Sequence, residues 1–197
     1  MFHVKHSPEV RARLEAYVDL VRTWTARLNL VSRRDAIAIW DRHIEDSLQL
    51  APLIPAGTDR AIDLGSGAGF PGLVLAIATG IPFTLIESDR RKAAFLLEAA
   101  RCTDAPVTIV NRRAETCQGL TAPLVTARAL APLPLLLSLA APFVARGGCL
   151  LAAKGANAAA ELTAATPDWN MRVERFASRT APDAVILRIT DIAHRQR

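Results

Sequence analysis

The sequence predicts an α/β fold, in which a mostly parallel sheet with helices on both faces ends in an antiparallel C-terminal hairpin. Two observations predict this class. From residue 60 onward, short apolar runs alternate with helical patterns, which is typical of a parallel sheet. Before residue 60, two amphipathic patterns predict a helical extension. We therefore divide the chain into a helical extension, 1–58, and a sheet domain, 59–197, joined in one compact unit.

The helical extension is predicted to contain two helices. The first begins with Ser7 as N-cap and Pro8 at the first helical position. Its apolar face has spacings of three and four: Val10, Leu14, Tyr17, Val21, Trp24 and Leu28. The second helix begins at Ser32 and is ended by Pro52 and Pro55. Its expected apolar stripe is Ile37, Trp40, Ile44, Leu48 and Ala51.

The sheet domain is predicted from short apolar runs bounded by turn residues. Parallel strands are expected near 60–64, 82–87, 106–110, 123–127 and 148–153. Helices are expected near 71–79, 89–102, 113–119, 132–145 and 156–165. The last two strand-like runs, 171–178 and 184–190, are joined by a turn-rich segment, which predicts the hairpin.

Composition limits the classes of protein that the chain can belong to. No segment reaches the about 20 apolar residues that a membrane-spanning helix needs, and MFHVKHSPEV lacks the apolar core of a secretory leader. We expect a soluble, cytoplasmic protein. Cys102, Cys117 and Cys149 are widely spaced, so we expect free thiols and no metal site. The net charge of +5 permits an anionic partner such as nucleic acid, without establishing one.

The stretch AIDLGSGAGFPGLVLAIA, residues 61–78, joins a predicted strand to a predicted helix. Its glycines, Gly65, Gly67, Gly69 and Gly72, let the backbone approach a ligand closely at the carboxyl end of the strand. The last three form GxGxxG, a weak pattern that a dinucleotide also fits. Asp63 extends the pattern to DxGxGxG, which resembles the first motif of S-adenosylmethionine-dependent methyltransferases. There the acid can accept, directly or through water, from the cofactor's ammonium group.

Two later segments supply further candidate cofactor contacts. Glu87 ends the second predicted strand, where a carboxylate can accept from both ribose hydroxyls. Asp89, close by, suits a helix N-cap better. The loop after the third strand would lie beside the adenine, with Ala114 and Glu115 as its contacts.

Five stretches spread over nearly the whole chain carry a more specific resemblance. They are LNLVS (28–32), WDRHIEDSL (40–48), DLGSGAGFPG (63–72), TARALAP (126–132) and AAKG (152–155). Together they resemble the bacterial 16S ribosomal RNA guanine-N7 methyltransferases, also called glucose-inhibited division protein B. In the N-terminal signature Asn29, Arg42, His43, Asp46 and Ser47 match. Val31 and Glu45 depart from it, which puts the packing of the helical extension in question.

The resemblance implies a Rossmann-like methyltransferase fold and methyl transfer from S-adenosylmethionine to N7 of one guanine in the decoding region of 16S rRNA. The implied partner is 16S rRNA, in the small ribosomal subunit or an assembly intermediate, with no membrane and no oligomer required. The expected cofactor-binding residues are Asp63, Gly65, Gly67, Gly69, Phe70, Glu87, Ala114, Glu115 and Arg128.

The expected reaction does not depend on proton transfer by acidic or basic side chains of the protein. Guanine N7 carries a lone pair and no proton, so no general base is needed and alignment of the reactants supplies most of the catalysis. Arg128 is the catalytic candidate, because it can orient the base through O6 or hold a phosphate. Its alternative role is a structural ion pair. His43 is either structural or an RNA contact.

Other functions stay open at this point. They are a methyltransferase for another RNA, a protein or a small molecule; a nicotinamide-dependent oxidoreductase; and an RNA-binding assembly factor without catalysis.

Overall fold

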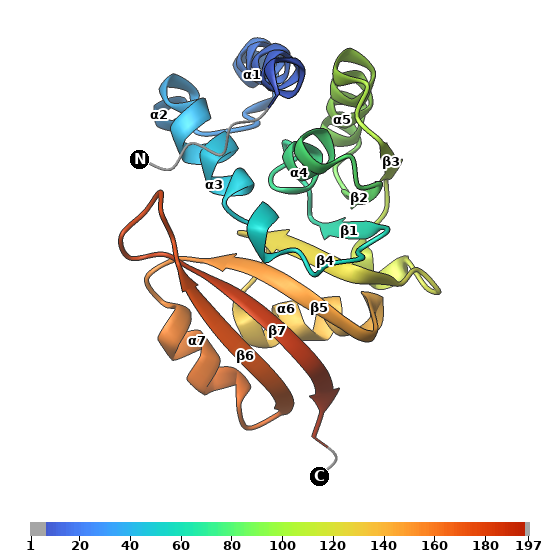
Figure 1. Cartoon of the computed structure of the whole chain (residues 1–197), viewed down its shortest axis with the longest axis vertical. Helices are drawn as coiled ribbons and strands as arrows, with labels where there is room; N and C mark the ends of the chain where they lie inside the picture. Colours follow the sequence, from blue (N-terminus) through green and yellow to red (C-terminus); the bar gives the residue numbers. More distant parts are fainter. Residues whose placement is uncertain (1–6, 196–197) are drawn as a thin grey trace.

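The protein is built around one seven-stranded sheet (Figure 1). The computed structural model describes residues 7–195, and only the backbone at positions 33 and 34. Part of the stretch that argues against a secretory leader therefore lies outside the described residues. The strands are β1 Ala61–Leu64, β2 Phe83–Ile86, β3 Val107–Val110, β4 Ala122–Arg128, β5 Val144–Lys154, β6 Trp169–Ala177 and β7 Val185–His194.

The strand order is β3-β2-β1-β4-β5-β7-β6. The first five strands in this order pair in parallel, and β7 is antiparallel to both β5 and β6. The predicted α/β class, with its C-terminal hairpin, is confirmed. From β1 the chain adds β2 and β3 on one side and then crosses back to place β4 on the other side, so the order of the strands reverses between β1 and β4. That point is where open α/β sheets bind ligands.

Helices cover both faces of the sheet (Figure 1). One face carries α1 Pro8–Leu28, α4 Gly72–Thr79 and α5 Arg90–Thr103; the other carries α6 Leu133–Ala140 and α7 Ala158–Ala165. Successive residues of a strand point to opposite faces. Leu124 accordingly belongs to the first apolar cluster and its neighbour Val125 to the second.

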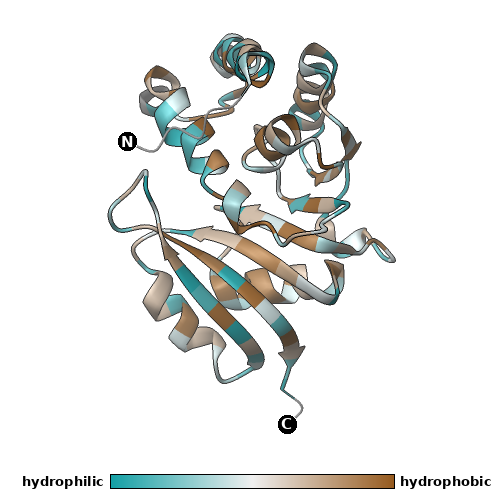
Figure 2. Cartoon of the chain, in the orientation of Figure 1, coloured by the Kyte–Doolittle hydropathy of each residue, from teal (hydrophilic) through white to brown (hydrophobic). Residues whose placement is uncertain are grey.

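Helix α4 explains why the helical extension packs where it does. Its sequence GLVLAIAT is apolar on all sides (Figure 2). Every residue from Leu73 to Ile77 is buried. A helix of this kind needs cover on its outer side as well as against the sheet. Leu14, Tyr17 and Leu48 of the helical extension supply it, in one apolar cluster with α4 and α5.

The predicted second helix is broken into shorter pieces, and this prediction was wrong. It consists of α2 Arg33–Ile37, a π-helical turn η1 Trp40–Ile44, α3 Glu45–Leu48 and a 3₁₀ turn η2 Ala51–Leu53. The break at Ala38 and the wider π turn change which residues face inward. Ile37, expected on the apolar stripe, is 84% exposed, whereas Ile39 is fully buried.

The structure also accounts for the departure at Glu45. The indole Nε1 of Trp40 donates a hydrogen bond to Glu45 Oε1 at 3.1 Å. The carboxylate therefore serves a partly buried donor on the same π turn.

The helix predicted at 113–119 is also corrected. Only one 3₁₀ turn, η3 Ala114–Thr116, forms there. The thiol of Cys117 is buried under this turn in the second apolar cluster, and β4 begins soon after it, at Ala122.

Candidate functional site

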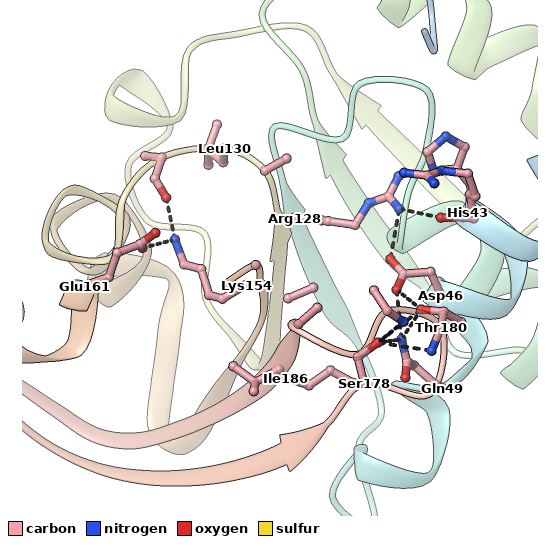
Figure 3. Close-up of a pocket in the computed structure, with 18 of the residues that line it drawn as sticks. His43, Asp46, Gln49, Arg128, Leu130, Lys154, Glu161, Ser178, Thr180 and Ile186 are labelled. Carbon is pink, nitrogen blue, oxygen red and sulfur yellow. Dashed lines mark hydrogen bonds and ion pairs between the residues drawn. The ribbon is translucent and has the colours of Figure 1, made fainter. Parts of the chain in front are cut away.

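A pocket of about 760 Å³ opens at the carboxyl ends of β4 and β5 (Figure 3). Four segments from distant parts of the chain form most of its walls, 42–49, 128–132, 153–155 and 178–186, and Glu161 adds one further side chain. Figure 3 shows Arg128 with His43 and Asp46 on one side, and Lys154 with Glu161 on the other. The loop between β6 and β7 closes a third side.

The glycine loop lies beside this pocket and follows β1. Gly69 has a φ of +96°, and a Cβ there would lie 2.8 Å from the Tyr17 hydroxyl oxygen. On Gly72, a Cβ would lie 2.5 Å from Asp63 Cβ. Both positions therefore need glycine. Leu130, from the pocket wall, packs directly over Gly65 and joins the two regions.

Asp63 lies beneath the glycine loop and is completely buried. It pairs in register with Thr126 of β4, whose hydroxyl donates to Asp63 Oδ1 at 2.6 Å. The other oxygen, Oδ2, has no hydrogen-bond partner within the described part of the chain. Burial raises the pKa of this carboxyl to about 6, and the hydrogen bond from Thr126 opposes the rise.

Glu87 lies at the carboxyl end of β2 and contacts the glycine loop. Its Oε2 accepts from the Gly67 amide at 2.8 Å, and its Oε1 accepts from the Asp89 amide at 2.7 Å. Each carboxylate oxygen keeps a second lone pair for a ligand hydroxyl. Asp89 caps α5 through the amides of Arg91 and Lys92, as predicted.

Ala114 and Glu115 lie on η3, just past the end of β3. Because β1, β2 and β3 are parallel, their carboxyl ends lie at the same end of the sheet. This turn therefore lies at the same end as the glycine loop and Glu87. Glu115 is exposed, and Ala114 is half-buried against the second apolar cluster. Neither residue lines the 760 Å³ pocket.

Arg128 ends β4 and forms the ion pair that the sequence left as an alternative role. Its Nη1 lies 3.0 Å from Asp46 Oδ2 and donates to the Arg42 carbonyl at 3.4 Å. The guanidinium also stacks over the Phe70 ring, 5.0 Å from its centre. The side chains of Arg128 and Asp46 are each only 18% exposed, so little solvent screens the pair.

His43 stacks on the Phe70 ring, with centroids 4.8 Å apart and planes 20° from parallel. Both ring nitrogens are buried and have no hydrogen-bond partner among residues 7–195. Burial and the nearby Arg128 charge lower the pKa of His43 to about 4. The imidazole is therefore neutral at pH 7 and holds one donor and one acceptor in reserve.

Sequence reasoning missed two groups that shape the pocket. Gln49, three residues along the chain, and Thr180, 134 residues away, both donate to Asp46 Oδ1. Lys154 donates to the Ala131 carbonyl at 2.6 Å and pairs with Glu161 at 2.7 Å, which steadies the segment after Arg128. The AAKG motif pointed to Lys154 without a role. Nothing in the periodicity pointed to the contacts of Gln49.

Two absences concern the described residues alone. Within 7–195, no helix has the length and apolar character to cross a membrane. The same part of the chain contains no group of three or more His, Cys, Asp or Glu side chains arranged to hold a metal ion. The three cysteines are free, with Cys102 exposed and the other two buried.

Comparison with known proteins gives consistent results. The sequence model of the GidB family, described as rRNA small subunit methyltransferase G, matches residues 10–184. A ribosomal RNA small subunit methyltransferase G from Gluconobacter oxydans is 52% identical over 185 residues, covering 94% of this chain and 95% of the relative. The protein of the same name from Acidiphilium cryptum is 57% identical over 182 residues, covering 91% and 84% of the two chains.

Solved structures similar to this chain share its fold at low sequence identity. Cofactor-bound Rv0187 from MTB superimposes with a TM-score of 0.59 at 16% identity, covering 95% of this chain and 92% of that one. A TehB-like SAM-dependent methyltransferase from Corynebacterium glutamicum gives 0.58 at 16% identity, covering 94% and 100%. These likenesses show the methyltransferase type of α/β sheet.

Proposed function

The chain belongs to the rRNA small subunit methyltransferase G family, and on that premise we propose that it methylates N7 of a guanine in the decoding region of 16S rRNA. It is a methyltransferase that uses S-adenosylmethionine and acts on ribosomal RNA. Membership of this family sets aside the nicotinamide-dependent alternative. The proposed place of action is the cytoplasm, and no second copy of the chain is required for the site.

The residues at the glycine loop fit the cofactor. Backbone with positive φ at Gly65, Gly67 and Gly69 forms a cradle without side chains. The orphaned Oδ2 of buried Asp63 is an acceptor that suits the ammonium group of the methionyl part, directly or through water. The spare lone pairs of Glu87 suit the ribose hydroxyls.

The proposed cofactor site extends from this cradle to both sides. Phe70 and Arg128 border it toward the pocket, and Ala114 and Glu115 border it toward the end of β3. When bound, S-adenosylmethionine supplies an electrophilic methyl group on a sulfonium. The tasks left to the protein are to bind, to orient and to exclude water.

The carrying observation is that the pocket and the glycine loop meet across Leu130 and Phe70. A volume of about 760 Å³ is sufficient to admit a nucleoside that has left its stack. Arg128, locked by Asp46 and by the Phe70 ring, has further N–H donors for guanine O6 or a phosphate.

Catalysis by this site rests on alignment. Because N7 attacks through an in-plane lone pair and has no proton to lose, no general base is needed. Holding donor and acceptor in line at near-attack distance supplies on the order of 7–11 kcal/mol. The partly buried ion pair of Arg128 and Asp46 suits this role, because it holds the guanidinium in place before the substrate binds.

The test is methyl transfer from labelled S-adenosylmethionine to 16S rRNA isolated from a strain that lacks this protein. We expect one N7-methylguanine per rRNA molecule, located by mass spectrometry in the decoding region. Free rRNA, assembly intermediates and complete small subunits are assayed side by side to find the preferred substrate.

Three outcomes would contradict the proposal. Labelling of protein or a small molecule, with none in rRNA, would favour another methyltransferase. Label at an exocyclic amine or a ring carbon would overturn the N7 assignment. Tight rRNA binding without turnover would favour a non-catalytic assembly factor.

A further inference from the structure

The loop that joins β6 to β7, residues 178–184, is part of the pocket although it lies far along the chain from the glycine loop. Ser178, Thr180, Ala181 and Ala184 line the pocket wall. Figure 3 shows Ser178 and Thr180 beside Gln49 and Asp46. A loop at this place is positioned to meet whatever substrate enters the pocket.

Buried Gln49 holds this loop in one conformation. It is only 4% exposed, and its Oε1 accepts from the Arg179 amide at 2.8 Å. Its Nε2 lies 3.2 Å from both the Ser178 and the Thr180 hydroxyl oxygens. Thr180 also donates to Asp46 Oδ1 at 2.7 Å. The backbone at Arg179 is thus fixed from within the protein, whereas the rest of that residue is exposed.

Arg179 differs from the other cations around the pocket. Arg42 pairs with Asp35 at 2.5 Å, Arg128 with Asp46 at 3.0 Å, and Lys154 with Glu161 at 2.7 Å. The guanidinium of Arg179 has no carboxylate or hydrogen-bond partner in the part of the chain that the structure describes. Arg179 does not itself line the pocket, but it lies in the chain between Ser178 and Thr180, which do. Its exposed, unneutralised cation is therefore available to an anionic ligand that reaches this loop.

We propose that Arg179 binds a backbone phosphate of the RNA next to the nucleotide that enters the pocket. This inference rests on the proposed function and adds the residue that grips the substrate at the pocket mouth. A planar guanidinium binds phosphate oxygens through two parallel hydrogen bonds. Because Gln49 has already ordered the backbone, binding restricts little more than the Arg179 side chain.

The location of the phosphate follows from the shape of the site. The base is the part of a nucleotide that must reach the glycine loop, and the sugar-phosphate chain stays at the mouth, where it continues into the rest of the RNA. Arg179 is exposed, and its two chain neighbours, Ser178 and Thr180, line the pocket. The contact is to backbone, so it adds affinity without reading sequence.

Three variants test the proposal. Arg179→Ala removes the guanidinium, and Arg179→Lys keeps the charge without the planar fork. The matched control is Arg146→Ala. Arg146 is also exposed and has no carboxylate partner among the described residues. It lies near the amino-terminal end of β5, whereas the pocket lies at the carboxyl end of that strand. The measurements are KM for the rRNA substrate, the salt dependence of rRNA affinity, S-adenosylmethionine affinity and Tm.

Arg179→Ala is expected to raise KM for rRNA on the order of five-fold and to lower the slope of log affinity against log salt by about 0.7–0.9. Arg179→Lys should keep the wild-type slope, with an intermediate KM. Arg146→Ala should match the wild type in both. Cofactor affinity and Tm should be unchanged in all three.

Distinct results separate failure of this inference from failure of the proposed function. If the wild type methylates rRNA and Arg179→Ala equals Arg146→Ala in KM and slope, Arg179 does not bind phosphate and only this inference falls. A loss of Tm or of cofactor affinity that accounts for the change in KM would make Arg179 structural and also overturns it. If the wild type leaves rRNA unmethylated, both proposals fall together.

Discussion

The glycine loop and the neighbouring pocket meet at Leu130 and Phe70, yet the chain builds them in different ways. The loop is made of backbone from one continuous motif, residues 63–72, with Glu87 beside it. The pocket is made of side chains from four segments that lie up to about 140 residues apart, between Arg42 and Ile186.

This difference explains what each region tolerates. The loop depends on the absence of side chains, so the addition of a single methyl group to Gly69 or Gly72 is expected to disrupt it. The pocket depends on pairs such as Arg128–Asp46 and Gln49–Arg179, so a substitution that removes one partner of a pair is expected to disrupt it. A buried group left unpaired costs more than the pair contributes.

The largest effect is expected in the glycine loop. In Gly72→Ala, the new Cβ would lie 2.5 Å from Asp63 Cβ and 2.7 Å from Leu85 Cδ2. We expect a loss of about 3–4 kcal/mol of unfolding free energy, together with cofactor binding, because the helix must shift from the strand. Denaturant unfolding and calorimetric titration measure the two quantities.

Gly80→Ala is the control for this change, because nothing lies within 4 Å of a Cβ there and its φ of +72° is the strained feature. It should cost about 1 kcal/mol and leave cofactor affinity unchanged. Equal losses in the two variants would show that close packing at Gly72 is unimportant.

The second prediction contrasts two buried groups by pH. The folded-state pKa of Asp63, about 6, lies above its unfolded value, so its contribution to stability is complete below pH ~4 and is lost as pH rises to ~6. The folded-state pKa of His43, about 4, lies below its unfolded value, so stability is gained as pH rises from ~4 to ~6.5.

Two variants separate these opposing slopes. In the wild type, ionisation of Asp63 lowers the unfolding free energy by about 2–3 kcal/mol as the pH rises from ~4 to ~6. Asp63→Asn lacks this ionisation, so its unfolding free energy should rise more steeply with pH than that of the wild type. His43→Phe keeps the ring stack on Phe70 and should remove the gain, which is smaller because part of the ring is solvent-screened. Unfolding free energies from pH 4 to 7 measure both slopes. Parallel curves for all three proteins would contradict the two pKa shifts.

The third prediction concerns the pocket. Arg128→Lys keeps the charge but loses the fork that spans Asp46 and the Arg42 carbonyl. We expect kcat/KM for rRNA to fall about 10- to 100-fold, the equivalent of one charged hydrogen bond. Methylation kinetics, with Tm measured in parallel, give the answer. If Arg128→Lys methylates rRNA at the wild-type rate, the role of Arg128 is structural only.

The smallest effect is expected at Glu45, outside both regions. Glu45→Leu restores the residue type usual in the family signature but removes the acceptor of the Trp40 indole. It should cost about 1 kcal/mol of unfolding free energy and leave rRNA methylation unchanged. Thermal unfolding and the methylation assay decide; a gain in stability would mean that the indole bond contributes nothing.

Most of the fold could be predicted from the sequence, since strand and helix periods are local signals. All seven strands lie where the apolar runs place them, and α1, α4, α5, α6 and α7 match their patterns. The helix expected from Ser32 failed because a π turn carries no distinct periodic signal. As a result Ile37, which was expected to be buried, is exposed, and Ile39 is buried in the core.

The cofactor side of the site is local in the same sense. The DxGxGxG motif and the acid that ends the next strand place Asp63, Gly67 and Glu87 together, because consecutive parallel strands end at one edge of the sheet. The pairing of β1 with β2 brings Glu87 to the Gly67 amide.

The pocket depends on how distant segments pack. The pairing of Asp46 with Arg128, and of Gln49 with Arg179, appears when the helical extension covers α4 and brings α3 against the β6–β7 loop. No spacing in the chain encodes such pairs, because long-range side-chain contacts arise from the burial of apolar faces. The sequence shows where the glycine motif lies, and the packing of the helical extension around α4 determines which side chains line the pocket.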